Sequence, residues 1–197
     1  MPGDTAYPVK PGFSDPVYDA QRVFQLLQQA MAAPGVPVEL DPVPVVAPLN
    51  AASMAICLAM LDAETPLWLD RNARLERLQQ HLDYHCECPL VDDPAAARYA
   101  LASTPAHVPP LSNCGGIDDD SEESTMLIVQ VPTLSGIEQS FATTNDSGAS
   151  QPLTIGGLPD DFWRQPGFQN GERQVDLIFT HSNRLIALPR FTRVVQS

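Results

Sequence analysis

The chain has 197 residues, of which 44% are hydrophobic, and this is enough for one globular domain with a real core. Its formal net charge is -13 at pH 7, and no basic stripe offsets that charge. A negative charge of this size excludes a general binding surface for nucleic acid or anionic lipid. An anionic small molecule could bind only in a local arginine pocket.

Targeting signals are missing from the sequence. The first residues have neither the basic region nor the apolar stretch of a signal peptide, and the longest apolar run, residues 51–61, is too short to span a bilayer. The four cysteines do not form the pattern of a secreted disulfide framework. We therefore expect a cytoplasmic protein that does not bind a membrane.

The lysine content excludes two cofactor classes. The only lysine is Lys10, in a proline-rich arm. A pyridoxal phosphate enzyme needs an interior lysine for its Schiff base, and a phosphate-binding loop needs Gly-Lys followed by Ser or Thr. The sequence also lacks G-x-S-x-G and G-x-G-x-x-G, so we expect no bound cofactor.

The first half of the chain predicts a flexible arm over residues 1–13 and then three helices. Ser14-Asp15-Pro16 is typical of a helix start, and Pro34-Gly35 ends that helix. Its expected buried stripe is Val17, Ala20, Phe24, Leu27 and Met31, widened by Val23, Leu26 and Ala30. A second helix, capped by Asn50, is apolar nearly all round and should be central. The third is expected over residues 71–82, with Leu75, Leu78 and Leu82 facing inward.

Strands are expected between and after these helices. The predicted ranges are 36–40, 66–69, 88–91, 99–102, 125–131, 141–143 and 153–155, with a short helix after Pro159. Residues 125–131 are apolar almost throughout and should be covered on both faces. Residues 103–124 are expected to form a mobile acidic loop. Residues 14–197 form a single domain in this interpretation.

The last strong pattern is a hairpin with strands 175–180 and 184–190 around the turn 181–183. If that turn leaves three residues unpaired, Asp176 faces Arg190 across the pair. The same register would place Ile186 and Leu188 on the Asp176 face of the hairpin.

Four residues form the most metal-like cluster: His81, His85, Cys86 and Cys88. Two histidines four residues apart on a helix end, followed by Cys-x-Cys, offer ligand types that zinc prefers. The alternative is a helix-terminal histidine favoured by the helix dipole, with two incidental thiols. We expect no metal, because structural zinc sites usually use Cys-x₂-Cys spacing.

Carboxylates and arginines give three further candidate sites. Asp62, Glu64 and Asp70 could be paired for acid/base work, but residues of this kind are more often turn formers and caps. Asp176 lies in an apolar strand and needs a partner, for which Arg190 and Arg184 are candidates. Arg190 with Thr192 could also bind a phosphate or phosphonate group.

With these residues in place, the chain resembles the PhnH family of the carbon–phosphorus lyase system. The resemblance runs from about residue 14 to 194. Its residues are Asp15-Pro16-Val17, Asp19-Ala20-Gln21, Phe24, Met31-Ala32, Pro34-Gly35, Asp62, Thr65-Pro66, Trp68-Leu69, Tyr84-His85, Pro89-Leu90, Asp176-Leu177, Leu188-Pro189-Arg190 and Thr192. The chain departs from the family pattern at Phe191, at the glycine loop near 145–148 and at the hairpin lead-in 172–175, and Cys86 and Cys88 are not family features.

The resemblance implies an α/β fold: a single-domain three-layer sandwich with a mixed central sheet. Such a fold is similar to the pyridoxal-phosphate transferases but lacks the cofactor lysine. It also implies a homodimer when isolated and assembly with the subunits PhnG, PhnI, PhnJ and PhnL. The family's complex condenses ATP with an alkylphosphonate, releases adenine and forms a ribose 1-alkylphosphonate 5-triphosphate. Within it, we expect a structural or accessory role.

Two alternatives stay open from the residues alone. The first is a small enzyme or binding protein that acts by itself on a phosphonate or phosphorylated ligand, with Asp176, Arg190, Thr192 and His85 as its ligand-binding candidates. The second is a metal-binding protein built on the histidine and cysteine cluster around residues 81–88.

Overall fold

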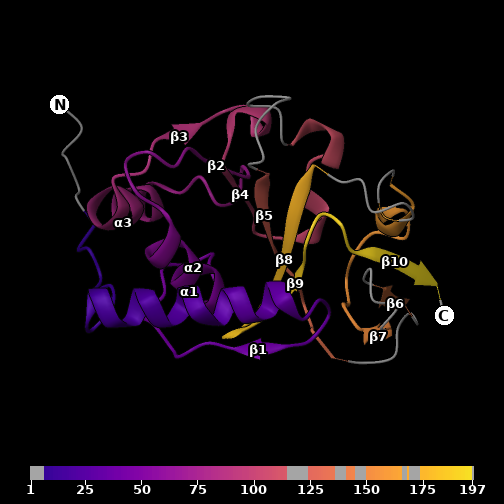
Figure 1. Cartoon of the computed structure of the whole chain (residues 1–197). Helices are drawn as coiled ribbons and strands as arrows, with labels where there is room; N and C mark the ends of the chain where they lie inside the picture. The colour runs from indigo at the N-terminus through magenta and orange to yellow at the C-terminus, as the bar shows by residue number, and fades with distance from the viewer. Residues whose placement is uncertain are drawn as a thin grey trace.

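The computed structural model describes residues 7–114, 124–135, 141–144, 150–165, 168 and 174–196 (Figure 1). Its α-helices are α1 (Pro16–Ala32), α2 (Ala51–Met60) and α3 (Glu76–Cys86). Its strands are β1 (Val38–Glu39), β2 (Leu67–Leu69), β3 (Leu90–Val91), β4 (Tyr99–Ala102), β5 (Thr125–Gln130), β6 (Phe141–Thr144), β7 (Ser150–Leu153), β8 (Val175–His181), β9 (Arg184–Leu188) and β10 (Arg193–Gln196). Short 3₁₀ turns are η1 (Pro94–Ala96), η2 (Pro105–His107), η3 (Leu111–Asn113) and η4 (Phe162–Arg164).

A seven-stranded mixed sheet forms the centre of the molecule, in the order β1-β9-β8-β5-β4-β2-β3. Strands β3, β2, β4, β5 and β8 run parallel, and β9 and β1 are antiparallel to their neighbours. A separate antiparallel sheet has the order β10-β6-β7. Strands β2, β4, β5 and β8 are mostly buried, as expected where both faces of a sheet are covered, whereas the edge strand β3 is more exposed.

The two faces of the large sheet bury two separate apolar cores. One core joins the sheet to α1, α2 and α3 and includes Ile178 and Leu185. The other lies under η3, η4 and β10 and includes Leu177, Phe179 and Trp163. Figure 1 shows the helices on one side of the sheet and β6, β7 and β10 on the other. An α/β single domain with a mixed sheet is therefore confirmed, but the layer on the second face consists of strands and 3₁₀ turns.

Helix α1 forms as predicted, with the Asp15 carboxylate accepting the Tyr18 backbone N–H at 3.1 Å. The centre of its buried stripe differs from the prediction. Val23, Leu27 and Ala30 are buried, whereas Val17 is 80% exposed. Phe24 is also largely exposed. The apolar residues of α1 form two overlapping stripes, and only the one that contains Ala30 can face the alanine-rich helix α2.

Helix α3 begins later and ends later than predicted. The Asp70 carboxylate accepts the backbone N–H groups of Asn72 and Ala73 at 2.7 and 2.8 Å, which holds the preceding residues in a turn. Leu75 precedes the first helical residue and is 37% exposed, so its predicted inward position was wrong. Leu78 and Leu82 are buried as predicted. At the other end, Glu87 has φ 54 and ends the helix in the left-handed conformation.

The hairpin turn has two residues, Ser182 and Asn183, because His181 pairs with Arg184. Ser182 has φ 55, a conformation that two-residue hairpin turns require. The predicted three-residue turn was therefore wrong. Leu177 pairs with Leu188, so Leu188 lies on the Leu177 face rather than on the Asp176 face. Ile186, opposite Phe179, lies on that same Leu177 face.

Several predictions concern segments that are described only in part. Residues 7–13 contact the helical side, where Lys10 Nζ donates to the Val45 carbonyl at 2.8 Å; the flexibility of the arm stays a prediction. The acidic run of the 103–124 loop and the altered glycine loop near 145–148 lie outside the described residues. The weak strand expected at 153–155 lies earlier, as β7, and the turn after Pro159 is η4. Among the described helices, none is long and apolar enough to cross a bilayer.

Candidate functional site

The carboxyl ends of three neighbouring parallel strands open on one crevice. Its volume is about 500 Å³, and its lining residues follow β4, β5 and β8 or cap α2: Asn50, Ser103, Thr104, Pro105, Gln130, Val131, Pro132, His181 and Ser182. In open α/β sheets, ligands bind outside the carboxyl ends of the strands. The crevice therefore has the position and the size of a small-molecule site.

A network of hydrogen bonds fixes the floor of this crevice. Asn50 backbone N–H donates to Gln130 Oε1 at 2.5 Å, and Asn50 Nδ2 donates to Thr180 Oγ1 at 3.1 Å. Gln130 Nε2 donates to the Pro48 carbonyl at 3.0 Å. Ser53 and Thr180 share a further hydrogen bond of 2.8 Å. Ser53, Gln130 and Thr180 are buried, and buried polar groups that are satisfied in this way hold their surroundings rigid.

Asp70 fixes the neighbouring part of the same edge. It is 2% exposed, and its Oδ2 accepts the backbone N–H and the hydroxyl of Ser103 at 2.6 and 2.8 Å. His107 Nδ1 lies 3.4 Å from the same oxygen, without forming a hydrogen bond to it. Asp70 therefore joins the ends of β2 and β4. Its expected use as a turn former is confirmed, and Asp62 has the same use, accepting the Glu64 backbone N–H at 2.9 Å.

His181 is the crevice residue with the clearest chemistry. Its Nδ1 lies 3.1 Å from the Val131 carbonyl oxygen, which can only accept. Nδ1 therefore carries a proton, and in the neutral ring Nε2 bears the free lone pair. The sequence pattern placed His181 in a turn. A polar residue at the carboxyl end of a buried parallel strand is the feature that could have identified His181 as a crevice residue.

The metal-like cluster is not assembled. Across the described ranges, no group of three or more His, Cys, Asp or Glu side chains is placed to bind a metal ion. His85 Nε2 lies 3.0 Å from the Lys10 carbonyl, and Cys86 donates to the Cys57 carbonyl at 3.6 Å. Cys86 ends α3, and Cys88 follows the left-handed cap at Glu87.

Burial keeps the thiols near α3 protonated. It raises the pKa of Cys86 to about 12 and that of Cys88 to about 11, with nearby acidic groups adding to both shifts. Because a thiolate is the metal ligand and the nucleophile, these two cysteines are poorly suited to either role. A zinc site or a reactive cysteine has no support among the described residues in this region.

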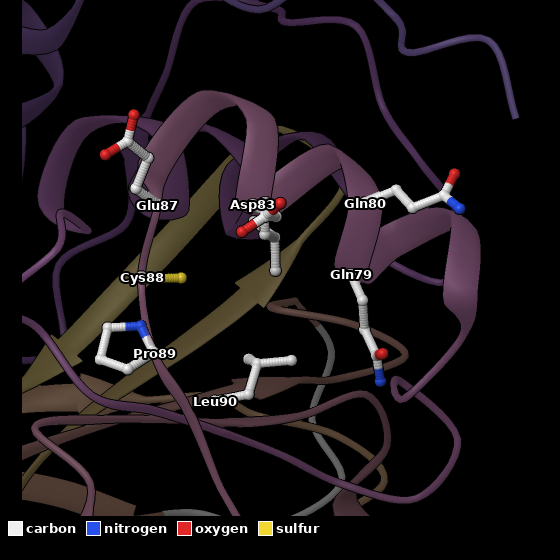
Figure 2. A pocket seen from close by; sticks show the side chains of 8 residues that line it. Gln79, Gln80, Asp83, Glu87, Cys88, Pro89 and Leu90 are labelled. Atoms are coloured by element: carbon white, nitrogen blue, oxygen red, sulfur yellow. The ribbon is translucent and has the colours of Figure 1, made fainter. Parts of the chain in front are cut away.

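A second cavity of about 430 Å³ lies between α3 and the edge strand β3. Figure 2 shows Asp83 and Glu87 at its rim, the Cys88 thiol directed toward its interior and Leu90 below. The carboxylates make this cavity unfavourable for a phosphonate or phosphate anion. This cavity is therefore a poor candidate site for an anionic ligand.

The predicted ligand residues Asp176, Arg190 and Thr192 lie at the opposite, amino-terminal edge of the sheet. The Asp176 carboxylate accepts the Arg190 backbone N–H at 2.7 Å and the Ser124 hydroxyl. The Arg190 guanidinium lies 4.9 Å above the Phe191 ring, and Thr192 is buried. His85 lies in the last turn of α3, on another element than these three residues, and the ligand role of all four stays a prediction.

The fold and the crevice define an α/β protein with a preformed crevice at the carboxyl edge of its sheet. Its single lysine, Lys10, is tied to a surface carbonyl and cannot form an interior Schiff base. A family model described as "Bacterial phosphonate metabolism protein (PhnH)" matches residues 11–195. The chain therefore belongs to the PhnH family of bacterial phosphonate metabolism proteins, as the sequence resemblance predicted.

A curated relative has the same family membership. It is the "Alpha-D-ribose 1-methylphosphonate 5-triphosphate synthase subunit PhnH" of Rhizobium meliloti (strain 1021), 30% identical over 191 residues. The alignment covers 92% of this chain and 93% of the relative, so the two proteins match along nearly their whole length.

Proposed function

We propose that this protein is the PhnH subunit of a ribose 1-methylphosphonate 5-triphosphate synthase and acts in phosphonate catabolism. The observation that carries the proposal is the match to a named synthase subunit over 92% of the chain. Its partners in this proposal are PhnG, PhnI, PhnJ and PhnL, and it works with them in the cytoplasm. On its own it is a homodimer.

Within that complex we assign it an accessory role rather than the chemical step. In support, the described residues show no assembled metal cluster, and the chain has no lysine available for a Schiff base. A likeness to the pyridoxal-phosphate transferase fold is consistent with the mixed sheet and is part of the proposal.

Genetic complementation tests the proposal. A phosphonate-using bacterium that lacks its own PhnH gene should regain growth on methylphosphonate as sole phosphorus source when it expresses this chain. Growth on inorganic phosphate serves as the control, because that route needs no phosphonate chemistry. Failure to restore growth, with the chain expressed and folded, would contradict the proposed function.

Arg190 and Thr192 stay candidates for an anion site within the same proposal. The Asp176 contact fixes the backbone at Arg190, so Arg190→Ala changes the side chain while leaving that hydrogen bond in place. If the guanidinium binds phosphonate, this variant should weaken complementation or ligand binding about tenfold or more, whereas Arg193→Ala nearby should not. Unchanged growth with Arg190→Ala would remove the ligand role.

A further inference from the structure

The crevice at the carboxyl edge of the sheet has properties that the proposed function does not use. Among the described residues that line it there is no Lys, Arg, Asp or Glu, although the chain has a net charge of -13. An anion would find no cation there, and a cation would find no carboxylate within the lining. The crevice therefore favours an uncharged ligand.

The walls of the crevice include apolar side chains. Pro105 comes from the 3₁₀ turn η2, and Val131 and Pro132 follow β5. Gly157 lies close to the Pro132 ring, because a Cβ at position 157 would come within 2.6 Å of it. Proline rings in fixed positions present broad faces against which a planar ring can pack.

Polar groups in the lining, among them His181 and Thr104, have hydrogen-bonding capacity left. His181 Nε2 offers a lone pair, since Nδ1 is directed at the Val131 carbonyl. Thr104 precedes η2 but makes no side-chain capping bond, so among the described contacts its hydroxyl has no partner. The amide groups of Asn50 and Gln130, by contrast, are used in the floor of the crevice.

We propose that this crevice binds an uncharged planar heterocycle, packed against Pro105 and Pro132, with a ring N–H or amino group donating to His181 Nε2. The rigid floor means that the site needs little rearrangement to accept the ring, because the Asn50–Gln130–Thr180 bonds already hold the three strand ends. The proposal rests on the crevice alone and is independent of assembly with other subunits.

Adenosine is a suitable probe, because it is uncharged and its amino group can donate to an imidazole nitrogen. With the isolated full chain, adenosine should bind with a Kd near or below about 1 mM and shift the NMR resonances of the His181 ring. N6,N6-dimethyladenosine, which lacks the amino donor, should bind about 3- to 10-fold more weakly. Methylphosphonate should leave the His181 ring unshifted.

The variants complete a double-mutant cycle. His181→Phe keeps a planar ring and removes the acceptor, so it should weaken adenosine binding about 3- to 10-fold and abolish the preference over the dimethyl analogue. Asp83→Asn, in the other cavity, should leave binding unchanged, and amide NMR spectra check that each variant is folded. Absence of adenosine binding, a full preference retained by His181→Phe, or methylphosphonate binding at His181 would each overturn the proposal. None of these outcomes depends on whether the chain joins the synthase.

Discussion

At the scale of single residues, two glycines have backbone conformations that a side chain would strain. Gly35 and Gly157 have φ of 83 and 77, in the left-handed region where a side chain is strained. A Cβ on Gly157 would lie 2.6 Å from the Pro132 ring, whereas on Gly35 it would lie 3.2 Å from Thr143 Oγ1. The first contact requires a ring to move, and the second can relax by rotation of a small side chain.

These contacts predict an order of stability losses. Gly35→Ala should lower the free energy of unfolding by about 1–2 kcal/mol, mainly from backbone strain. Gly157→Ala should cost more, because the clash adds to the strain. Urea unfolding of both variants measures the order, and an equal or reversed order would contradict the account of the Pro132 contact.

His81 is the least satisfied polar residue of the described core. It is 1% exposed, and neither ring nitrogen has a hydrogen-bond partner. Burial, with smaller contributions from His85 and Lys10, lowers the pKa of His81 to about 4. In the unfolded chain a histidine titrates near 6.5, at about its ordinary value. The neutral folded form therefore contributes its full stability above pH 6.5, and this is lost as the pH falls toward 4.

Replacing this ring should remove that acid sensitivity. His81→Phe should be as stable as the parent chain at pH 7, because no hydrogen bond is lost, and should lose less stability between pH 6.5 and pH 4. Tyr84→Phe, an exposed substitution on the same helix, serves as the control and should keep the parent pH dependence. Parallel pH profiles for His81→Phe and the parent would show that His81 is not buried in its neutral form.

At the scale of elements, the hydrogen bonds of Asn50 join α2 to the sheet. Its side chain caps the helix by accepting the Ser53 N–H at 2.9 Å and donates to Thr180 on β8. The second contact closes a long-range link between residues 130 positions apart. The Asn50 side chain therefore fixes both the start of α2 and the carboxyl end of β8.

Two substitutions at Asn50 separate these roles. Asn50→Ala removes the cap and the strand contact, so the free energy of unfolding should fall by about 1–2 kcal/mol for the cap and further for the lost hydrogen bond to Thr180. Asn50→Asp keeps a capping oxygen and loses only the donor, so it should be the more stable variant. Equal losses in thermal or urea unfolding would show that the contact with β8 dominates.

The elements also show what the sequence could and could not predict. Strong local patterns predicted α1, α2, β5 and the hairpin, because the spacing of apolar residues and the capping residues lie within each segment. The buried face of α1 and the hairpin register depended on packing partners and on one positive φ at Ser182. The crevice could not be predicted, because Asn50, Asp70, Ser103 and His181 meet only when four strands are aligned.

At the scale of the whole molecule, the predicted α/β class and the family are confirmed, and the ligand role of the four predicted residues stays a prediction. Asp176 and Arg190 fix the amino-terminal edge of the sheet, whereas the preformed crevice lies at the carboxyl edge. The structure therefore separates two candidate surfaces, one for an anion at Arg190 and one for an uncharged ring at His181. The accessory role that we propose would require a third surface for contact with partner subunits.

Co-purification tests the central claim most directly. The tagged chain, co-expressed with untagged PhnG, PhnI, PhnJ and PhnL from one bacterium, should retain PhnG, PhnI and PhnJ in fixed stoichiometry through size-exclusion chromatography. His181→Phe should be retained equally well, because the crevice is not part of that claim. Recovery of the folded chain alone, with its partners assembled without it, would contradict its assignment as a synthase subunit.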